Sequence, residues 1–334
     1  MVWLLSSERT GHILSATVQA VEVGNFMSKK VFDCFLYNGE WKLLLLRLNE
    51  MFEVVDEFVV VEANMSFSGV PKKFHLMDLG SQISPFLSKI TYLQISEDLG
   101  ASDAWEREAY HRNFASDYLK SQEGLIILSD VDEIIYAETV NQIKSDKISQ
   151  SFSFHLTMNY FAFDFQNYEG VEKDCVWNCA FDSSYLATYE LQELRDSIRH
   201  GTISSTAIRN AGCHLSYFMD REGVQQKVKE FSHQELNTIS FHEKLNIPHL
   251  VANSLDLYSR ENYLWRIDQP KTKFKFVDAN PDLYKSYFSS NILKLEIERQ
   301  SMEIERQYRM FVDSLSWRLV APLRFAARVF RWRG

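Results

Sequence analysis

The stretch LIILSDVDE, from Leu125 to Glu133, decides the fold. Its first four residues form an apolar run after Gly124, which is typical of a short strand buried in the middle of a sheet. The strand then ends in Asp130 and Asp132, two carboxylates two residues apart. Residues at this spacing in extended chain point to one side, so both would face the sheet edge where α/β proteins bind ligands.

Strands and helices alternate around this segment. Apolar or β-branched runs predict three further strands, at 31–37, 54–63 and 90–95. Apolar residues at helical spacing predict helices at 41–52 and 105–119. This alternation indicates an α/β fold with a mostly parallel sheet covered on both faces. The aromatic, alternating segment 152–181 predicts longer strands added to that sheet, with antiparallel pairing as one option.

The remaining chain divides by composition. Residues 224–231 predict a helix, whereas 246–281 is rich in loops, with three prolines as punctuation. Residues 291–315 predict one long helix dense in Glu and Arg. We therefore expect three parts: an N-terminal extension at 1–27 outside the fold, the α/β domain at 28–290, and a charged helix with a basic amphipathic tail at 291–334.

Composition excludes several classes of protein. With 334 residues, 46% of them hydrophobic, the chain can bury one large core or two modest ones. A net charge of -9 argues against a protein that binds nucleic acid over a basic surface. Four cysteines are too few for a disulfide framework, which favours a reducing compartment, and no run of about 20 apolar residues could span a bilayer. We expect a cytoplasmic protein.

The C-terminal tail has the opposite charge to the body. Between Trp317 and Arg333, five arginines alternate with large apolar side chains and no acid occurs. Such a segment can lie in the headgroup region of an anionic membrane, on the inner face of the cell membrane, or it can dock on a partner protein. The helix at 291–315 would then be a spacer or the contact of a homodimer.

The two aspartates suit a hard cation. Mg²⁺ or Mn²⁺ takes one or two carboxylates plus phosphate oxygens, and it stabilises the charge that grows on a departing nucleotide diphosphate. The alternative is structural, since Ser129 or Asp130 could cap a helix that follows. A nucleotidyltransferase would use the same metal chemistry, but it needs a basic, glycine-rich phosphate loop near the first strand, and Asn38-Gly39 does not provide one.

Five ordered segments resemble a known family. They are DCFLYNGE with LRLNE (33–50), VDEFVVVE with FSG and KK (55–73), WERE with RN (105–113), SDVDEI (129–134), and AGCHLSYF with Lys227 and FSHQE (211–235). Together they resemble glycosyltransferase family 17, the β-1,4-N-acetylglucosaminyltransferases, as a bacterial-type member. Cys213 and Ile135 stand where that family usually has tryptophan and often has proline.

The resemblance implies a GT-A fold, a metal-dependent transfer with inversion, and a nucleotide-sugar donor such as UDP-GlcNAc. Asp130 and Asp132 would hold Mn²⁺ or Mg²⁺. His214 would be a third metal ligand or a pyrophosphate donor, with a structural histidine as the alternative. Arg107 and Arg112 could reach the diphosphate, or they could lie on a solvated helix.

The same resemblance indicates further residues that could bind the nucleotide sugar or activate the acceptor hydroxyl. Lys72 and Lys73 could contact phosphate or carry only surface charge, and Glu62 could accept hydrogen bonds from the ribose or base. The general base is open among four acids, of which we favour the first two: Asp164, Glu235, Glu169 and Glu222. The predicted function is sugar transfer to a cell-surface or lipid-linked glycan. The alternative is a non-catalytic, membrane-associated interaction protein with a GT-A-like core.

Overall fold

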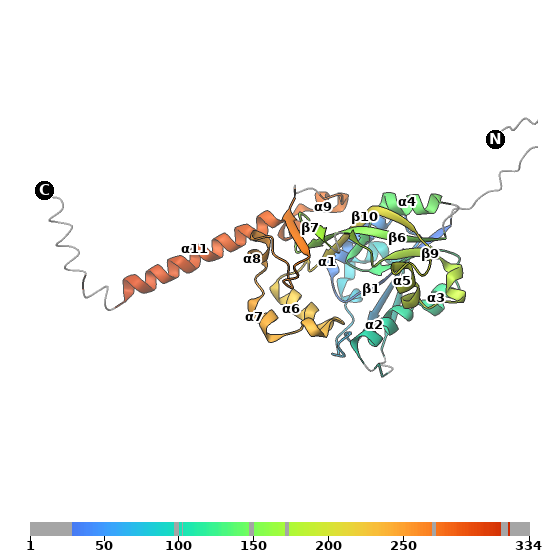
Figure 1. The fold of residues 1–334 in the computed structure, drawn as a ribbon, viewed down its shortest axis with the longest axis horizontal. Coiled ribbons are helices and arrows are strands. Elements are labelled where there is room, and N and C mark those ends of the chain that lie inside the picture. The colour runs from blue at the N-terminus through green and yellow to red at the C-terminus, as the bar shows by residue number, and fades with distance from the viewer. Residues whose placement is uncertain are drawn as a thin grey trace, which may run out of the picture.

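The computed structural model describes residues 29–96, 100–101, 103–146, 150–170, 174–268, 272–314 and 320. Within them, one sheet of eleven strands forms the centre of the molecule, and helices pack on both of its faces (Figure 1). The predicted α/β class is therefore confirmed. The extension predicted at 1–27 lies outside the described residues.

Four parallel strands form one half of the sheet, in the order β3-β2-β1-β4. They are β1 (Lys30–Leu36), β2 (Glu57–Ala63), β3 (Ile90–Ile95) and β4 (Gly124–Asp130). All four predicted strands are confirmed, but β2 begins later than predicted because Val54 and Val55 donate backbone hydrogen bonds to Met51 at the end of the preceding helix. Gly124 is required at the start of β4, since a Cβ there would lie 2.4 Å from the Lys30 carbonyl oxygen.

The other half of the sheet is mixed. Its strands are β5 (Glu133–Ile135), β6 (Ser151–Tyr160), β7 (Phe165–Gly170), β8 (Asp174–Cys175), β9 (Cys179–Asp182), β10 (Thr206–Ser216) and β11 (Tyr263–Ile267). β9 runs antiparallel to β4 and joins the halves, and β6, β7 and β11 follow it in order. The antiparallel option for 152–181 is confirmed, whereas β10 is a parallel partner of β6 that no sequence pattern indicated.

Alternation along the strands produces a core on each face. In β1, Val31 and Phe35 point into the core beneath helix α1 (Trp41–Met51), together with Leu44. Phe32 and Cys34 point into the opposite core. Both sets are almost fully buried, so the sheet is covered on both faces as predicted.

Seven further helical segments flank this part of the sheet. They are α2 (Ala104–Asn113), α3 (Ser116–Lys120), α4 (Ala137–Ser145), α5 (Leu191–Arg199), and the 3₁₀ segments Leu76–Gln82, Ser84–Lys89 and Ser183–Ala187. The prediction of one continuous helix at 105–119 is wrong, because the chain breaks between α2 and α3. At the break, the Asn113 side chain accepts a hydrogen bond from the Gln192 backbone N–H and so caps α5, whose own preceding residue Glu190 supplies no side-chain cap.

The C-terminal third is more helical than predicted. It contains α6 (Arg221–Glu230), α7 (Ile239–Lys244), α8 (Ile247–Ala252), α9 (Lys275–Ala279), α10 (Pro281–Tyr284), α11 (Ser289–Asp313), and the 3₁₀ segments Gln234–Leu236 and Lys285–Tyr287. The segment 246–281 is not simply loop. Pro248 and Pro281 lie in the first turns of α8 and α10, where a missing N–H costs no hydrogen bond, so they start helices instead of ending them.

The long helix predicted at 291–315 is confirmed as α11, which begins against α8 and projects away from the body (Figure 1). Among the described residues, no helix combines the length and the apolar character needed to cross a bilayer. The predicted basic tail, apart from Val320, lies outside the described residues.

Candidate active site

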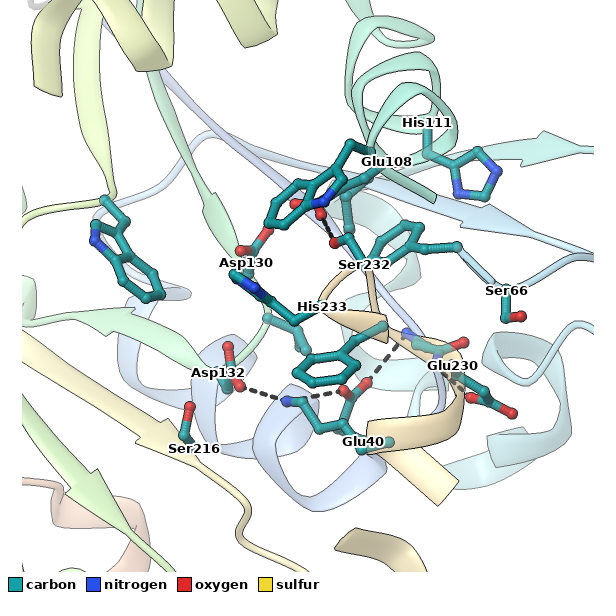
Figure 2. Close-up of a pocket in the computed structure, with 18 of the residues that line it drawn as sticks. Glu40, Ser66, Glu108, His111, Asp130, Asp132, Ser216, Glu230, Ser232 and His233 are labelled. Carbon is teal, nitrogen blue, oxygen red and sulfur yellow. Dashed lines mark hydrogen bonds and ion pairs between the residues drawn. The ribbon is translucent and has the colours of Figure 1, made fainter. Parts of the chain in front are cut away.

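A cavity of about 600 Å³ opens where several strands end (Figure 2). Its lining includes residues at the carboxyl ends of five mutually parallel strands: Leu36, Ala63, Asp130, Tyr160 and Ser216. This is the sheet edge predicted to bind ligand, and the predicted aspartates lie in it.

Asp130 is held by two arginines. Its Oδ1 accepts a hydrogen bond from Arg112 at 2.9 Å, and its Oδ2 accepts one from Arg195 at 3.0 Å. Burial alone would raise the pKa of Asp130, but the guanidinium groups of Arg195 and Arg112 outweigh burial and hold this pKa well below its usual range. Asp130 is therefore ionised at neutral pH, and both of its oxygens are already bonded.

Asp132 is held differently. Lys227 of α6 donates to its Oδ2 at 2.7 Å, and the Nε2 of His214 lies 3.7 Å from its Oδ1. Burial raises the pKa of Asp132, but Lys227 and His214 outweigh burial and lower it below its usual value. Lys227 also lies 3.5 Å from Glu40, so one ammonium group bridges two carboxylates across the cavity (Figure 2).

A buried arginine holds the loop between these aspartates. Arg47 of α1 is fully buried and binds Asp33 of β1 through two hydrogen bonds, at 2.5 and 2.7 Å. It also donates to the carbonyl oxygens of Asp130 and Glu133, at 2.8 and 2.9 Å. The conformation of the Asp130–Glu133 turn therefore depends on a helix almost 90 residues earlier in the chain.

Two of the three predicted metal ligands, Asp132 and His214, are placed to bind one divalent cation. Among the described residues, no group of three His, Cys, Asp or Glu side chains is placed to hold a metal. Asp132 and His214 nevertheless lie close enough to share one ion, and Mg²⁺ or Mn²⁺ often completes its coordination with substrate phosphates and water. Both oxygens of Asp130 accept hydrogen bonds from arginines, whereas Lys227 occupies only the Oδ2 of Asp132 and leaves its Oδ1 facing His214, whose Nε2 bonds to the Ser216 hydroxyl at 2.7 Å. We therefore assign the ion to Asp132 and His214, and the role of Asp130 as a metal ligand stays a prediction.

Two residues predicted to bind the nucleotide sugar, Glu62 and Lys73, lie outside the cavity lining. Glu62 lies between Val61 and Ala63, which line the cavity, and its carboxylate instead accepts hydrogen bonds from the backbone of His75 and Leu76 and from the Tyr92 hydroxyl. Lys73 is exposed and pairs with Asp78 at 2.6 Å. Neither residue belongs to the cavity lining, although Glu62 lies 3.8 Å from the Nζ of Lys72, which does line the cavity.

The two predicted arginines have unequal positions. Arg112 is buried and contacts Asp130, Glu108 and Gln192. Arg107 donates to the backbone carbonyl of Phe67 at 2.5 Å and so holds the loop that follows β2. Both therefore support cavity walls, and neither is among the cavity-lining residues.

The predicted general bases lie outside the cavity lining. Asp164 is buried and receives two hydrogen bonds from Ser289, from its N–H at 2.8 Å and its hydroxyl at 2.6 Å, so it holds the start of α11. Glu235 is exposed and pairs with the Nδ1 of His233, whose hydrogen bond lowers the pKa of this carboxylate. Their catalytic role stays a prediction that the geometry does not favour.

Three residues that line one side of the cavity have a buried polar atom without a hydrogen bond in the described part of the chain, and one of these atoms, the Nζ of Lys72, lies 3.8 Å from the Glu62 carboxylate. The three atoms are the Tyr37 hydroxyl, the Asn38 Oδ1 and the Lys72 Nζ. Tyr37 and Asn38 follow β1, and Lys72 follows β2, so all three lie at the ends of adjacent strands. Buried polar groups usually have partners, and a bound polar ligand would supply them here.

Sequence reasoning missed several residues of the cavity. Arg195 comes from α5 and has no local motif around it, although it contacts both Asp130 and Glu133. Lys227 lies in one of the family segments, and no pattern around it indicates a contact with Asp132. A usable signal did exist for Asp33 and Arg47, since a charged residue in the middle of an apolar strand needs a buried partner.

Comparison with known proteins gives a family. The model of glycosyltransferase family 17 matches residues 20–267. Two curated relatives are β-1,4-mannosyl-glycoprotein 4-β-N-acetylglucosaminyltransferases: the Rattus norvegicus protein is 28% identical over 178 residues, and the Homo sapiens protein is 28% identical over 146. These matches cover 50% and 40% of this chain, and they span 32% and 27% of the relatives' own lengths.

Solved structures are more distant. HddC from Yersinia pseudotuberculosis is 13% identical, with a TM-score of 0.34, and the match covers 55% of this chain and 90% of that one. Glucosyl-3-phosphoglycerate synthase from Mycobacterium tuberculosis, in complex with Mn²⁺, UDP-glucose and glycerol 3-phosphate, is 10% identical, with a TM-score of 0.35 and coverage of 60% and 76%.

The sequence match and the fold agree. The matched region contains the parallel half of the sheet, the mixed half that flanks it, and the cavity with Asp130 and Asp132. The predicted GT-A class with a C-terminal helical extension is confirmed. Because the family model covers most of its residues, the chain belongs to glycosyltransferase family 17.

Proposed function

We propose that this family 17 glycosyltransferase moves GlcNAc from UDP-GlcNAc to a hydroxyl of a glycan acceptor, with inversion and with help from a divalent cation. One observation carries the proposal: Asp132 lies at the carboxyl end of the central strands, bonded to Lys227 and within 3.7 Å of His214. The names of the curated relatives support GlcNAc as the sugar.

The nucleotide would bind on the side of the cavity formed by β1 and β2. Tyr37, Asn38 and Lys72 offer a hydroxyl, an amide oxygen and an ammonium group there, all without hydrogen-bond partners among the described residues. Tyr37 is only 3% exposed, so its hydroxyl needs a partner that a ribose or a base can supply. From this position the diphosphate would extend toward Asp132.

The diphosphate would meet cationic groups. Burial would lower the pKa of Lys227, but Asp132 and Glu40 outweigh burial and raise it, so the ammonium group stays charged. When a Mn²⁺ or Mg²⁺ ion is bound by Asp132 and His214, it adds charge that stabilises the departing UDP. Lys227 and Arg195 supply positive charge from the chain itself, held in place by their carboxylate partners.

Transfer by single displacement inverts the anomeric carbon. The acceptor oxygen forms a bond to this carbon, the bond to the diphosphate oxygen breaks, and UDP leaves with the electron pair. The hydroxyl proton passes to a carboxylate of the protein, which acts as general base. The cavity therefore needs an ionised acid on the side opposite the departing UDP.

The direct test is calorimetric binding of UDP-, GDP- and CMP-sugars to the wild-type protein, with Mn²⁺ and then with EDTA. We expect UDP-GlcNAc to bind with Mn²⁺ and to bind at least about tenfold more weakly without it. An Asp78→Asn variant, altered at an exposed ion pair outside the cavity, serves as the control. Failure of every nucleotide sugar to bind the folded protein would contradict the proposal.

We also propose that the C-terminal region attaches the enzyme to the inner face of the cell membrane as a pair of copies. In α11, Ile297, Ile304 and Phe311 recur every seven residues and are 67%, 66% and 55% exposed. An apolar stripe at this spacing suits pairing with a second α11. The arginine-rich tail beyond α11 supports attachment to anionic lipid.

Full-length protein is expected to sediment with phosphatidylglycerol vesicles but not with phosphatidylcholine vesicles, and high salt should release it. Its mass by light scattering should be that of two chains, and Ile304→Lys should give a single chain. A Glu298→Lys change, on the same helix but outside the stripe, serves as control. Equal sedimentation with both lipids would contradict the attachment to anionic membrane. A single-chain mass for the wild type would contradict the pairing through α11.

A further inference from the structure

The cavity has a second side, opposite Tyr37 and Lys72, formed by α5 and the segment before β9. Trp177, which precedes β9, is partly exposed and lines it, and its ring centre lies 6.0 Å from that of His214. The Trp177 ring therefore borders the group that marks the reaction centre. Asp196 and Arg199 of α5 also line the cavity, and the Arg199 guanidinium lies 5.0 Å from the centre of the Trp177 ring.

This side is fixed to the reaction centre by one arginine. Arg195 donates from its Nε to the Trp177 carbonyl oxygen and from its Nη2 to Asp130 at 3.0 Å. Asp196, the next residue of the same helix, lines the same cavity as Asp130 and Asp132. An acceptor that lies on Trp177 would be placed between α5 and the departing diphosphate.

The carboxylates around the cavity are not equivalent. In the described part of the lining they are Glu40, Glu108, Asp130, Asp132, Asp196 and Glu230. Four of them pair with a lysine or an arginine: Glu40, Glu108, Asp130 and Asp132. Glu230 accepts a hydrogen bond from the Asn38 amide at 2.9 Å, on the nucleotide side.

Asp196 has only a neutral partner. The Nε2 of Gln192 donates to its Oδ2 at 2.9 Å, and within the described residues its Oδ1 has no hydrogen bond and neither oxygen has an ion pair. Gln192 is fixed in turn, because its Oε1 accepts a hydrogen bond from Arg112. An oriented carboxylate with one open oxygen is what a general base requires.

The charge of Asp196 does not stabilise its helix, although its side chain accepts a hydrogen bond from Gln192 one turn earlier. Asp196 lies in the last turn of α5, where its backbone carbonyl accepts from His200. The C-terminal end of a helix is the negative end of its dipole, so an ionised carboxylate there is unfavourable. The loss of its charge should therefore leave the fold at least as stable.

We propose that the Trp177 ring carries the acceptor sugar and that Asp196 is the general base that takes the proton from its attacking hydroxyl. The apolar face of a pyranose packs on an aromatic ring, and Arg199 lies beside that ring to bind a sugar oxygen. As the acceptor oxygen bonds to the anomeric carbon, its proton passes to the Oδ1 of Asp196 and UDP leaves with the electron pair. This inference rests on the proposed transfer function.

Asp196→Asn keeps the shape and removes the base. With UDP-GlcNAc and a panel of p-nitrophenyl mannosides, glucosides and galactosides, UDP release should fall about 10²- to 10⁴-fold in kcat. The Kd for UDP-GlcNAc and the melting temperature should equal the wild-type values within experimental error. Glu193→Gln is the matched control, since Glu193 lies exposed on the same helix outside the cavity lining.

Trp177→Ala should raise the KM for the aryl pyranosides about tenfold or more, with the Kd for UDP-GlcNAc unchanged, and Trp177→Phe should recover most of the loss. The proposal is overturned if Asp196→Asn releases UDP within about threefold of the wild-type rate, or if it weakens donor binding as strongly as turnover. Donor binding by the wild-type protein reports on the proposed function alone, so the two failures are distinguishable.

Discussion

We expect Asp132→Asn to lower the kcat of sugar transfer about 10²- to 10³-fold. The substitution keeps the shape of the side chain but removes the charge that holds Lys227 at 2.7 Å and that lies 3.7 Å from His214. Without that charge, a cation bound beside His214 loses its only carboxylate ligand in our assignment. Mn²⁺ binding in the presence of UDP, measured by calorimetry, should fall in parallel with turnover.

Asp130→Asn is the informative comparison. Asp130 already gives one oxygen to Arg112 and the other to Arg195, so we expect the variant to keep Mn²⁺ affinity within about threefold while its donor affinity falls. Lys73→Gln, at an exposed ion pair, should match the wild type in both measurements. If Asp130→Asn loses Mn²⁺ as completely as Asp132→Asn, the assignment of the ion to Asp132 and His214 is wrong.

The parts of the site that the sequence could predict are local ones. β4 and the two aspartates after it follow from an apolar run that ends in acids, and both the strand and the turn lie within ten residues. Parallel packing then places that turn at the same edge as the ends of β1 and β2. Local pattern and sheet topology are enough to locate the cavity.

Two of the predicted donor-binding residues, Glu62 and Lys73, lie one position away from residues that line the cavity. Val61 and Ala63 face the cavity, so Glu62 between them must face the other way, because side chains alternate along a strand. Lys72 lines the cavity, whereas its neighbour Lys73 pairs with Asp78 on the surface. Which of two adjacent residues faces a ligand depends on strand register, and the composition of a motif does not determine register.

The residues missed entirely are brought in by tertiary packing. Arg195 reaches Asp130 from a helix 65 residues later in the chain. Packing also holds Asp164, which the sequence did single out, because it accepts a hydrogen bond from Ser289, 125 residues later. In both cases the partner lies on an element whose position depends on the mixed half of the sheet. No spacing within the sequence encodes those contacts.

Arg47→Met is expected to cost about 3–5 kcal/mol of the free energy of unfolding, the largest stability effect that we predict. Arg47 and Asp33 are both fully buried, so the variant leaves the Asp33 carboxylate without its partner in the core. It also removes the donors to the carbonyl oxygens of Asp130 and Glu133. Urea-induced unfolding followed by circular dichroism measures the change, and Lys73→Met at the exposed pair should shift stability by less than about 0.5 kcal/mol.

A double variant separates the two roles of Arg47, which neutralises Asp33 in the core and holds the Asp130–Glu133 turn by hydrogen bonds. Asp33→Leu with Arg47→Met leaves no uncompensated charge between β1 and α1, and it should recover a large part of the lost stability, since a buried pair can often be replaced by apolar residues. It does not restore the hydrogen bonds to the Asp130–Glu133 turn. We therefore expect UDP-GlcNAc to bind the refolded double variant at least about tenfold more weakly than the wild type. Full recovery of donor binding would show that Arg47 serves the core alone and does not position the turn that carries Asp132.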